Sequence, residues 1–344
     1  MIMSSMQRVL TTMNHQEPDK VPLFLFTTMH PAKEKNISIK EYFASAESVA
    51  EGQLLMRTKY RNDCYYTFYY ASIELEAFGV KSFFRDGTPV NAGTPFINTP
   101  EDIIKMRVPQ LHDSPSLQKV LKTTEILKKE GGDVPIIGVV ISPFSLPIMQ
   151  MGFAKYIDLL YESPNMFDIL IQKNIEFCLQ WFQAQLDAGA TAICYFDPVS
   201  SPSIVPPAIY KKYGFPITQQ IFKKMQAPIA IHLASGRSLR IAEDLKKTDA
   251  LVIGCSSEED IGELKDTYRG KMTVLGNLNG IEMCNWGKDD AYNNIQTIIK
   301  KAAKGGGLII SDNHGEIPYQ VKHETLMHIS DAVEKYGYYP IRGV

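Results

Sequence analysis

Eight short apolar runs that alternate with amphipathic segments constrain this chain more than any other feature. Each run is four to eight residues long, and most are rich in β-branched or aromatic side chains. This composition is typical of strands that are buried on both faces of a sheet. The runs are residues 21–26, 63–68, 134–141, 191–196, 228–232, 250–254, 272–276 and 307–310.

Segments with apolar residues three and four positions apart lie between most of these runs and predict helices. The longest of them has Ser163 as N-cap, Pro164 in the first turn and Gly189 as the stop signal. Alternation of strands and helices implies a parallel sheet, and eight repeats imply a closed (β/α)₈ TIM barrel of the α/β class. The predicted helices are residues 45–60, 114–130, 164–188, 206–225, 237–247, 259–267, 288–304 and 320–336.

Two segments stand outside this repeat. Residues 1–20 predict an N-terminal helical extension, and residues 79–108, which follow the second strand, predict an inserted antiparallel β-hairpin. No second domain and no internal repeat of the solenoid type is evident, so we expect a single barrel domain over residues 1–344.

Charge and composition exclude several classes of protein. The net charge of −2 gives no basic surface for nucleic acid or for an anionic membrane. No run of 18 apolar residues occurs, and the first 20 residues lack the apolar core of a signal peptide. The five cysteines include no CxxC pair, so we expect reduced thiols in a cytoplasmic protein.

Titratable residues follow several of the predicted strands. Asp197 follows the fourth strand, His232 ends the fifth, and His314 follows the eighth. Barrel enzymes carry their chemistry on the loops after the carboxyl ends of the strands, so we expect these three side chains to converge on one pocket. Each also has a structural explanation, because a single histidine can be hydrogen-bonded in a core and an aspartate before Pro198 can cap a turn.

Five segments carry a resemblance to a known family. They are NHQEPDKVPLF (14–24), SPFSLPIMQMGFAKYIDLLYESP (142–164), DPVSSPSIVPPAIYKKYGFP (197–216), GNLNG (276–280) and HGEIP (314–318). In this order they resemble the uroporphyrinogen decarboxylase superfamily over nearly the whole chain. The third segment is similar to the one found in methylcobalamin:coenzyme M methyltransferases.

Departures from the family pattern point to its corrinoid-linked methyltransferases rather than to its decarboxylases. The decarboxylases carry an arginine-rich segment after the first strand and an aspartate after the second. Here the first segment, LFLFTTMHPAKE, has no arginine, and Tyr70 takes the place of the aspartate. The coenzyme M methyltransferases bind zinc through His-x-Cys and a later Cys, and the matching residues here are His232, Ala234 and His314. Both thiolates are missing, so the resemblance leaves open whether His232 and His314 hold a zinc ion.

The resemblance implies a methyltransferase that demethylates a small methylated substrate, favouring a methoxylated aromatic, and passes the methyl group to the cobalt of a corrinoid protein. His232 or His314 would be the catalytic acid, oriented by Asp197. The expected partners are the corrinoid protein and a small-molecule methyl donor or acceptor, and a homodimer stays open. Two alternatives remain: a thiol methyltransferase with a rearranged zinc site, and a barrel without catalytic activity. The expected substrate contacts are Tyr70, Phe24, Phe26, Ser142, Phe144, Asn277 and Arg237.

Overall fold

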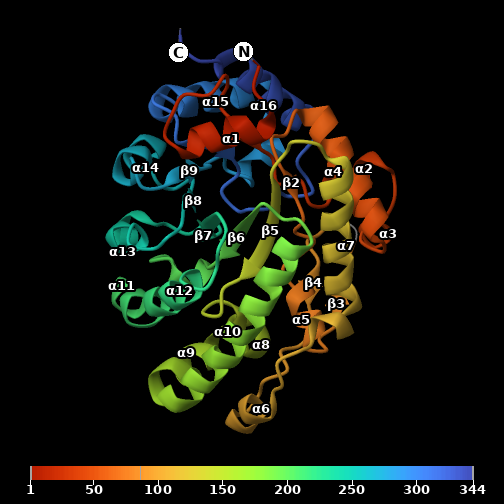
Figure 1. Ribbon diagram of the computed structural model, residues 1–344, viewed down its shortest axis with the longest axis vertical. Helices are drawn as coiled ribbons and strands as arrows, with labels where there is room; N and C mark the ends of the chain where they lie inside the picture. Colours follow the sequence, from red (N-terminus) through yellow and green to blue (C-terminus); the bar gives the residue numbers. More distant parts are fainter. Residues whose placement is uncertain (1, 86, 343–344) are drawn as a thin grey trace.

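The computed structural model describes residues 2–85 and 87–342, so residue 86 of the predicted hairpin and the outermost residues of the chain lie outside the described part. Its main sheet has eight parallel strands that curl in the order β1-β10-β9-β8-β7-β6-β5-β2 (Figure 1). This arrangement confirms the predicted α/β fold of the TIM-barrel type. Each strand overlaps one predicted run: β1 (Leu23–Phe24), β2 (Tyr65–Tyr66), β5 (Ile136–Ile141), β6 (Ala192–Phe196), β7 (Ile229–His232), β8 (Val252–Gly254), β9 (Thr273–Leu275) and β10 (Leu308–Ser311).

Side chains link β1 and β2, the two outer strands of this order. The Asp63 N–H donates to the Leu23 carbonyl over 2.8 Å, and the Asp63 carboxylate accepts from the Leu23 N–H over 3.1 Å. The Asn62 carboxamide accepts from the Leu25 N–H over 2.7 Å and donates to the Leu25 carbonyl over 3.1 Å. Asn62 and Asp63 thus replace part of the strand-to-strand hydrogen bonding between β1 and β2.

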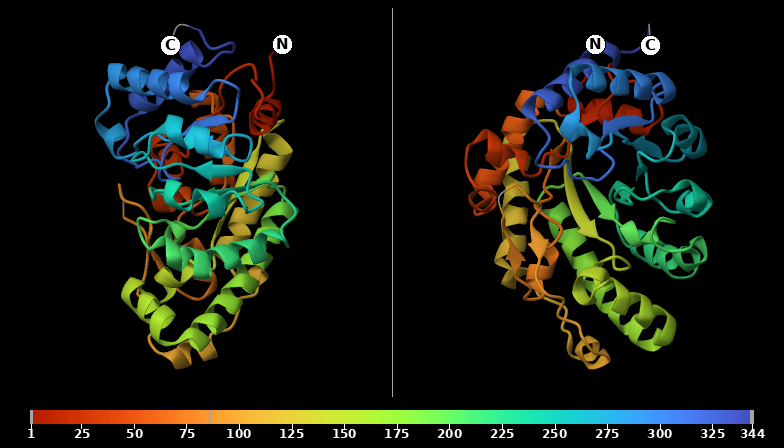
Figure 2. Two further views of the ribbon diagram at one scale, coloured as in Figure 1. Left: turned by 90° about the vertical axis from the view of Figure 1, so that its left-hand side faces the viewer. Right: turned by 180° about the vertical axis from the view of Figure 1, so that it is seen from behind.

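Helices cover the outer face of the curled sheet (Figures 1 and 2). Within the described residues, none of them combines the length and the apolar composition needed to cross a bilayer. Gly189, with φ of 114°, follows the carboxyl-terminal end of α10, as predicted. At the amino-terminal end, Ser163 occupies the N-cap position, but its side chain makes no capping hydrogen bond. The helices that match predicted segments are α4 (Ala46–Tyr60), α7 (Pro115–Glu130), α10 (Pro164–Asp187), α13 (Ala242–Leu245), α14 (Ile261–Tyr268), α15 (Lys288–Ala302) and α16 (His323–Tyr336).

One predicted helix is broken. Residues 206–225 form α11 (Pro207–Ile209), a π-helical turn η3 (Tyr210–Gly214) and α12 (Phe215–Phe222) instead of one continuous helix. Pro216 lacks an N–H and cannot complete the hydrogen-bond ladder of an α-helix at this point, which accounts for the wider turn before it.

The insert after β2 contains the predicted antiparallel hairpin and also a helix that the sequence did not predict. Strands β3 (Ser82–Phe83) and β4 (Asn91–Ala92) pair antiparallel, and α6 (Pro100–Lys105) follows. The Ser82 hydroxyl lies 2.8 Å from the hydroxyl of Ser72, which ties the hairpin to the segment after β2. Helix α6 lies at the end of the molecule near α10 (Figure 1). The Lys173 ammonium of α10 donates to the carbonyls of Ile103 and Met106.

Further short helices lie between the strands and the main outer helices. All but η4, which lies in the predicted helix 237–247, are absent from the predicted set; most of them have only three to six residues and show no clear periodicity, whereas α9 has ten. They are α2 (His30–Glu34), α3 (Ile39–Tyr42), α5 (Ile73–Ala77), η1 (Leu111–Asp113), α8 (Leu146–Met151), α9 (Phe153–Glu162), η2 (Pro198–Ser200), η4 (Leu239–Ile241) and η5 (Glu282–Asn285).

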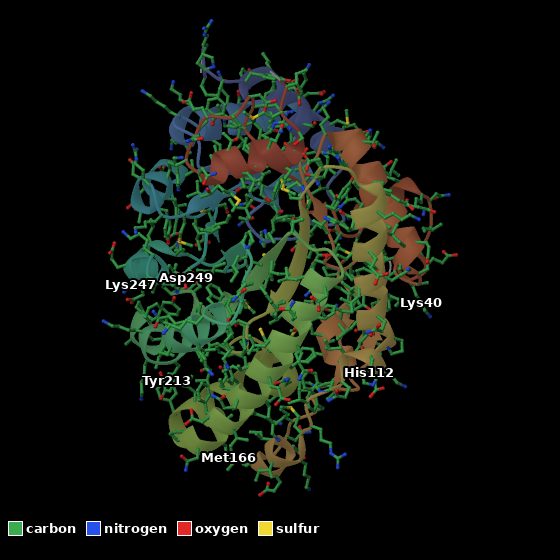
Figure 3. All side chains as sticks on the ribbon, in the orientation of Figure 1. Lys40, His112, Met166, Tyr213, Lys247 and Asp249 are labelled. Atoms are coloured by element: carbon green, nitrogen blue, oxygen red, sulfur yellow. The ribbon has the colours of Figure 1, made fainter. Side chains whose placement is uncertain are left out.

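The hydrophobic core has an outer layer and an inner layer. The outer layer fills the space between the sheet and the helices, and charged residues such as Lys40, Lys247 and Asp249 lie on the exposed side (Figure 3). Alternate residues of the strands point inward and fill the barrel, as the two-residue period of a strand requires. The inner layer includes Phe24, Phe26, Cys64, Tyr66, Phe68, Ile137, Val139, Cys194, Val252, Leu275 and Ile309.

The predicted N-terminal helix is α1 (Ser5–Met13), which lies across the amino-terminal end of the barrel. Ser4 and Gln7 form a capping box at its start. Arg8 holds the helix in place, because its guanidinium is paired with Asp19 over 2.7 Å and with Asp63 over 2.6 Å.

Candidate active site

The carboxyl ends of the parallel strands gather at one end of the barrel, which we call the mouth. His232 is the last residue of β7, and the strand register places it beside Phe196 at the end of β6 and Gly254 at the end of β8. His314 follows β10 and lies close enough to His232 for its charge to lower the pKa of His232. The two histidines singled out from the sequence therefore come together at the mouth.

The His232 side chain is completely buried, yet its polar atoms are unpaired. Its ring stacks on Phe196, with centroids 4.8 Å apart and planes inclined by 16°. Neither ring nitrogen has a hydrogen-bond partner among the described residues. Burial, with a smaller contribution from the charge of His314, lowers the pKa of His232 to about 3, so its imidazole is neutral at pH 7. Since buried polar groups are nearly always hydrogen-bonded, the two unpaired nitrogens make His232 a candidate for contact with a ligand.

Aromatic rings continue from His232 across the interior of the barrel. Phe68 stacks on Phe196, with 5.9 Å between centroids and 8° between planes. Tyr66 lies 5.7 Å from Phe68, and Phe26 stacks on Tyr66 at 4.2 Å. We call these five rings, Phe26, Tyr66, Phe68, Phe196 and His232, the aromatic row. Flat apolar rings of this kind favour contact with another aromatic molecule.

The segment after β10 folds against the aromatic row. The Asp312 carboxylate accepts hydrogen bonds from the N–H groups of His314 over 2.9 Å and Gly315 over 2.8 Å. Gly315 has φ of 79°, and a Cβ at this position would lie 2.2 Å from the Phe196 ring. The Tyr66 hydroxyl donates to the Gly315 carbonyl over 3.0 Å. A residue without a side chain is therefore required at 315, next to the rings.

Two carboxyl groups of this segment ionise near neutral pH. Burial raises the pKa of Asp312 to about 6, although the backbone N–H groups bound to it lower it. Burial also raises the pKa of Glu316 to about 7, against the effect of the Thr28 hydroxyl, which donates to this carboxyl. The negative charge of Asp312 raises the pKa of Glu316 further. The sequence pattern alone gives Glu316 no role, although it belongs to the strand-end segment after β10.

Asp197 is buried at the end of β6, but it faces hydroxyl groups and not the histidines. Its carboxylate accepts from Ser142 over 2.5 Å, from Ser145 over 2.7 Å and from Ser200. Burial raises its pKa, and these three hydroxyls oppose that shift. The backbone N–H of Asp197 donates to the His232 carbonyl over 2.8 Å. Asp197 and Ser142 thus connect the loops after β5 and β6. Among the described residues, Asp197 makes no hydrogen bond to the ring of His232 or His314.

Two of the expected substrate contacts pack away from the aromatic row. The Tyr70 hydroxyl donates to Glu76 over 2.9 Å, and its ring packs against Phe43 and Phe84. The ring of Phe144 is buried against Tyr156 of α9 and Phe167 of α10.

The other four expected contacts, apart from Ser142, lie in four different places. Phe26 belongs to the aromatic row, whereas Phe24 faces a cavity at the amino-terminal end of the barrel. Asn277 donates to the carbonyls of Ser256 and Glu259 and so ties together the loops after β8 and β9. Arg237 is exposed at the rim of the mouth and is paired with Glu258 over 2.8 Å.

The two histidines do not form a zinc site by themselves. Zinc sites in proteins need at least three protein ligands. In the described part of the chain, no group of three His, Cys, Asp or Glu side chains is arranged to hold a metal ion. The donor set at His232 and His314 therefore does not fit a zinc ion.

Comparisons of the sequence point to one family. The sequence model of the family described as uroporphyrinogen decarboxylase (URO-D) matches residues 4–336. A uroporphyrinogen decarboxylase of Geotalea uraniireducens is 26% identical over 249 residues, which cover 70% of this chain and 71% of that protein. A uroporphyrinogen decarboxylase of Geobacter metallireducens is 27% identical over 271 residues and 76% of each chain.

Solved structures share the fold at lower sequence identity. A methyltransferase from Methanosarcina mazei superposes with a TM-score of 0.85 at 16% identity, covering 97% of this chain and 99% of that chain. A B12-independent methionine synthase from Shewanella superposes with a TM-score of 0.57 at 13% identity, covering 93% and 95% of the two chains. At these identities the likeness concerns the fold alone.

Proposed function

The chain belongs to the uroporphyrinogen decarboxylase family, and on that premise we propose that it is a methyltransferase. The proposed reaction moves a methyl group from a small methylated substrate, a methoxylated aromatic, to the cobalt of a corrinoid that a separate protein carries. The likeness to the Methanosarcina methyltransferase over nearly the whole of both chains supports this choice within the family. The corrinoid is a second substrate here, so no residue of this chain is assigned to hold it.

The observation that carries the proposal is the buried, unpaired imidazole at the end of the aromatic row. An aromatic ether beside His232 would lie next to the stacked rings of Phe196 and Phe68, with which an aromatic molecule can pack. The neutral His232 can then donate one hydrogen bond to the ether oxygen. Such a bond would satisfy a group that is otherwise left unpaired in the core.

The reaction needs a proton at a defined place. The methyl–oxygen bond breaks, the methyl carbon bonds to cobalt(I), and the departing phenolate oxygen takes up one proton. A histidine with a pKa near 3 does not hold a proton for this purpose at neutral pH. Glu316, whose pKa is about 7, does hold one in part of the molecules. We therefore assign proton donation to Glu316 and orientation of the ether oxygen to His232.

Decarboxylation of a porphyrinogen fits the mouth less well. A substrate with many carboxylates requires several cationic partners. The four residues after Phe26 are buried and uncharged at neutral pH: Thr27, Thr28, Met29 and His30. The next two cations are already engaged, because Lys33 donates to the Tyr319 carbonyl and Lys35 is paired with Glu51.

The test is methyl transfer from a panel of methoxylated aromatics to cobalt(I) cobalamin by the purified chain. We expect at least one compound to be demethylated, and we expect His232→Ala to slow this by about 100-fold or more. His112→Ala is the matched control, because this histidine is exposed on η1. The proposal is wrong if no compound is demethylated, or if His232→Ala turns over at the wild-type rate.

A further inference from the structure

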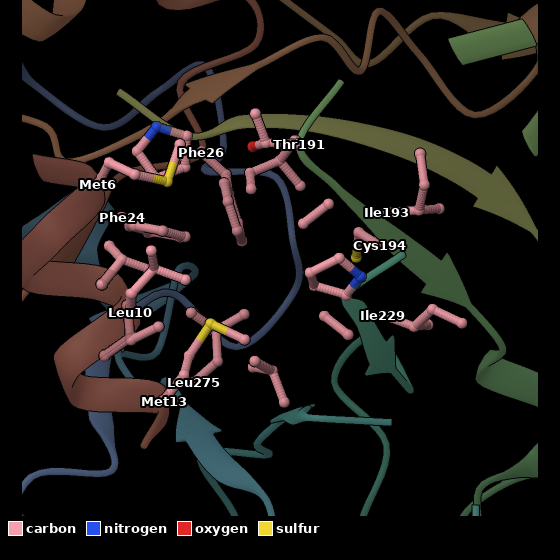
Figure 4. Close-up of a pocket in the computed structure, with 18 residues that line it drawn as sticks. Met6, Leu10, Met13, Phe24, Phe26, Thr191, Ile193, Cys194, Ile229 and Leu275 are labelled. Carbon is pink, nitrogen blue, oxygen red and sulfur yellow. The ribbon is translucent and has the colours of Figure 1, made fainter. Parts of the chain in front are cut away.

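A cavity lies inside the barrel at the end opposite the mouth, directly under α1 (Figure 4). Its volume is about 70 Å³. Met6, Leu10 and Met13 of α1 point toward it from one side, and inward-facing residues of the strands form the other side (Figure 4). Phe26 separates the two sites, because it lines the cavity and also stacks on Tyr66 in the aromatic row.

Small side chains on two neighbouring strands leave this space open. Barrel interiors are normally filled by bulky branched residues. Here Ala192 of β6 and Ala230 of β7 face inward, and Ala230 lies beside Cys194 in the strand register. Both alanines keep a partly accessible surface even though they face the inside of the barrel.

The cavity persists because polar contacts hold its cover in place. Arg8 is fixed by Asp19 and Asp63, and the Thr12 carbonyl accepts from the Gly307 N–H over 3.0 Å. These contacts anchor α1 without requiring that its apolar side chains reach the opposite wall. Leu10, which lines the cavity, is 47% exposed, so the side of the cavity that Leu10 covers faces solvent.

The side chains that line the cavity determine which class of ligand it can bind. Seventeen of its lining residues have no hydroxyl, amide or charged side chain, and the one hydroxyl, that of Thr191, is already bonded to the Ile136 N–H over 2.9 Å. Burial raises the pKa of the Cys194 thiol, which is therefore uncharged. A water molecule needs two to four polar partners, whereas apolar cavities stay dry and bind small apolar molecules.

We propose that this cavity is a second binding site, which takes a small apolar molecule of about the size of benzene. It lies outside the mouth and does not depend on the proposed methyl transfer. The ligand class follows from the wall alone, since nothing in the cavity can recognise a charge or a hydrogen-bonding group.

The test uses xenon and benzene as probes of the full-length protein. We expect xenon to appear in the cavity of pressurised crystals, and benzene to raise the melting temperature of the wild type in a saturable way. Ala230→Leu fills the cavity and should abolish this rise, whereas Ala44→Leu, at an exposed position, should preserve it. Ala192→Ile offers a second way to fill the space from the neighbouring strand if Ala230→Leu does not fold.

The readout is binding and not turnover, so its outcome is independent of the methyl-transfer assay. Xenon absent from the cavity of wild-type crystals would overturn the proposal. So would a benzene response that persists unchanged in a folded Ala230→Leu or Ala192→Ile variant, since it would then arise elsewhere on the protein.

Discussion

The imidazole of His232 lies flat against Phe196, and on its other side Gly254 approaches so closely that a Cβ would lie 2.4 Å from the His232 ring. The position of the imidazole therefore depends on the large Phe196 ring and on the lack of a side chain at Gly254. This contact explains why a glycine ends β8, and it gives a direct way to displace His232 without removing it.

Gly254→Ala should push the His232 ring out of place. A shift of about 1 Å in a catalytic group can reduce the rate by about 100-fold, so we expect kcat/KM for demethylation to fall by about 10- to 100-fold. Overpacking should cost about 1–3 kcal/mol of stability, measured by urea unfolding. Gly287→Ala is the control, since the nearest atom to its added Cβ lies at 3.7 Å. Full activity in a folded Gly254→Ala variant would show that the placement of His232 is unimportant.

The proposed acid predicts a pH dependence. Glu316 has a raised pKa of about 7, so its protonated form is complete at lower pH and disappears as the pH rises through 7. The demethylation rate should therefore fall on the alkaline side, with an apparent pKa near this value. Glu316→Gln should lose about 100-fold or more in kcat. Glu258→Gln, which removes an exposed carboxylate at the rim, should have the pH profile of the wild type.

Glu74 predicts a pH dependence of stability. Its side chain is buried, Oε1 accepts from the Ile141 N–H over 2.9 Å, and Oε2 has no partner among the described residues. Burial raises its pKa to about 8, so the folded state binds a proton that the unfolded state releases above about pH 4.5. Stability should therefore decrease as the pH rises, by about 1.4 kcal/mol between pH 7 and pH 9. In Glu74→Gln this part of the decrease should be absent, as measured by urea unfolding at both pH values.

Asp63 should be one of the most sensitive positions for stability. Its carboxylate is paired with buried Arg8 and also accepts from the Ser5 hydroxyl and the Leu23 N–H. Asp63→Ala leaves the Ser5 hydroxyl and the Leu23 N–H without this acceptor and removes one of the two carboxylates paired with Arg8, so we expect a loss of about 3–5 kcal/mol in the free energy of unfolding. Arg61→Ala, which breaks an exposed pair with Asp331, should cost less than about 1 kcal/mol. Equal effects of the two changes would contradict the role given to Asp63.

The fold could be predicted from the sequence because its strands are buried on both faces. All six residues of β5 and all four residues of β10 are buried, so these strands appear in the sequence as unbroken apolar runs. An apolar pattern does not reveal the break in residues 206–225, because Pro216 acts on the helical hydrogen bonds and leaves the spacing of apolar side chains unchanged. Short helices such as α8 were missed because two turns give too little periodicity.

The candidate site could be predicted only in part. The order of the strands brings His232 and His314 to one end, and this much follows from the position of each at a strand end. The alternation of side chains between the two faces of a strand ends with β5 at Ile141. The sequence therefore does not predict that the Phe144 ring turns toward α9 and α10. The importance of Glu316 depends on burial by loops that are distant in the sequence, and a single sequence does not reveal that burial.

The most direct test of the central claim follows an isotopically labelled methyl group. The labelled methoxylated aromatic is incubated with the chain and cobalt(I) cobalamin, and the methyl carbon is observed by NMR. The proposal predicts that the label moves to cobalt, that one equivalent of phenol forms, and that both events require His232 and Glu316. Label that stays on oxygen with every substrate, or label that moves equally fast with His232→Ala and Glu316→Gln, would contradict it.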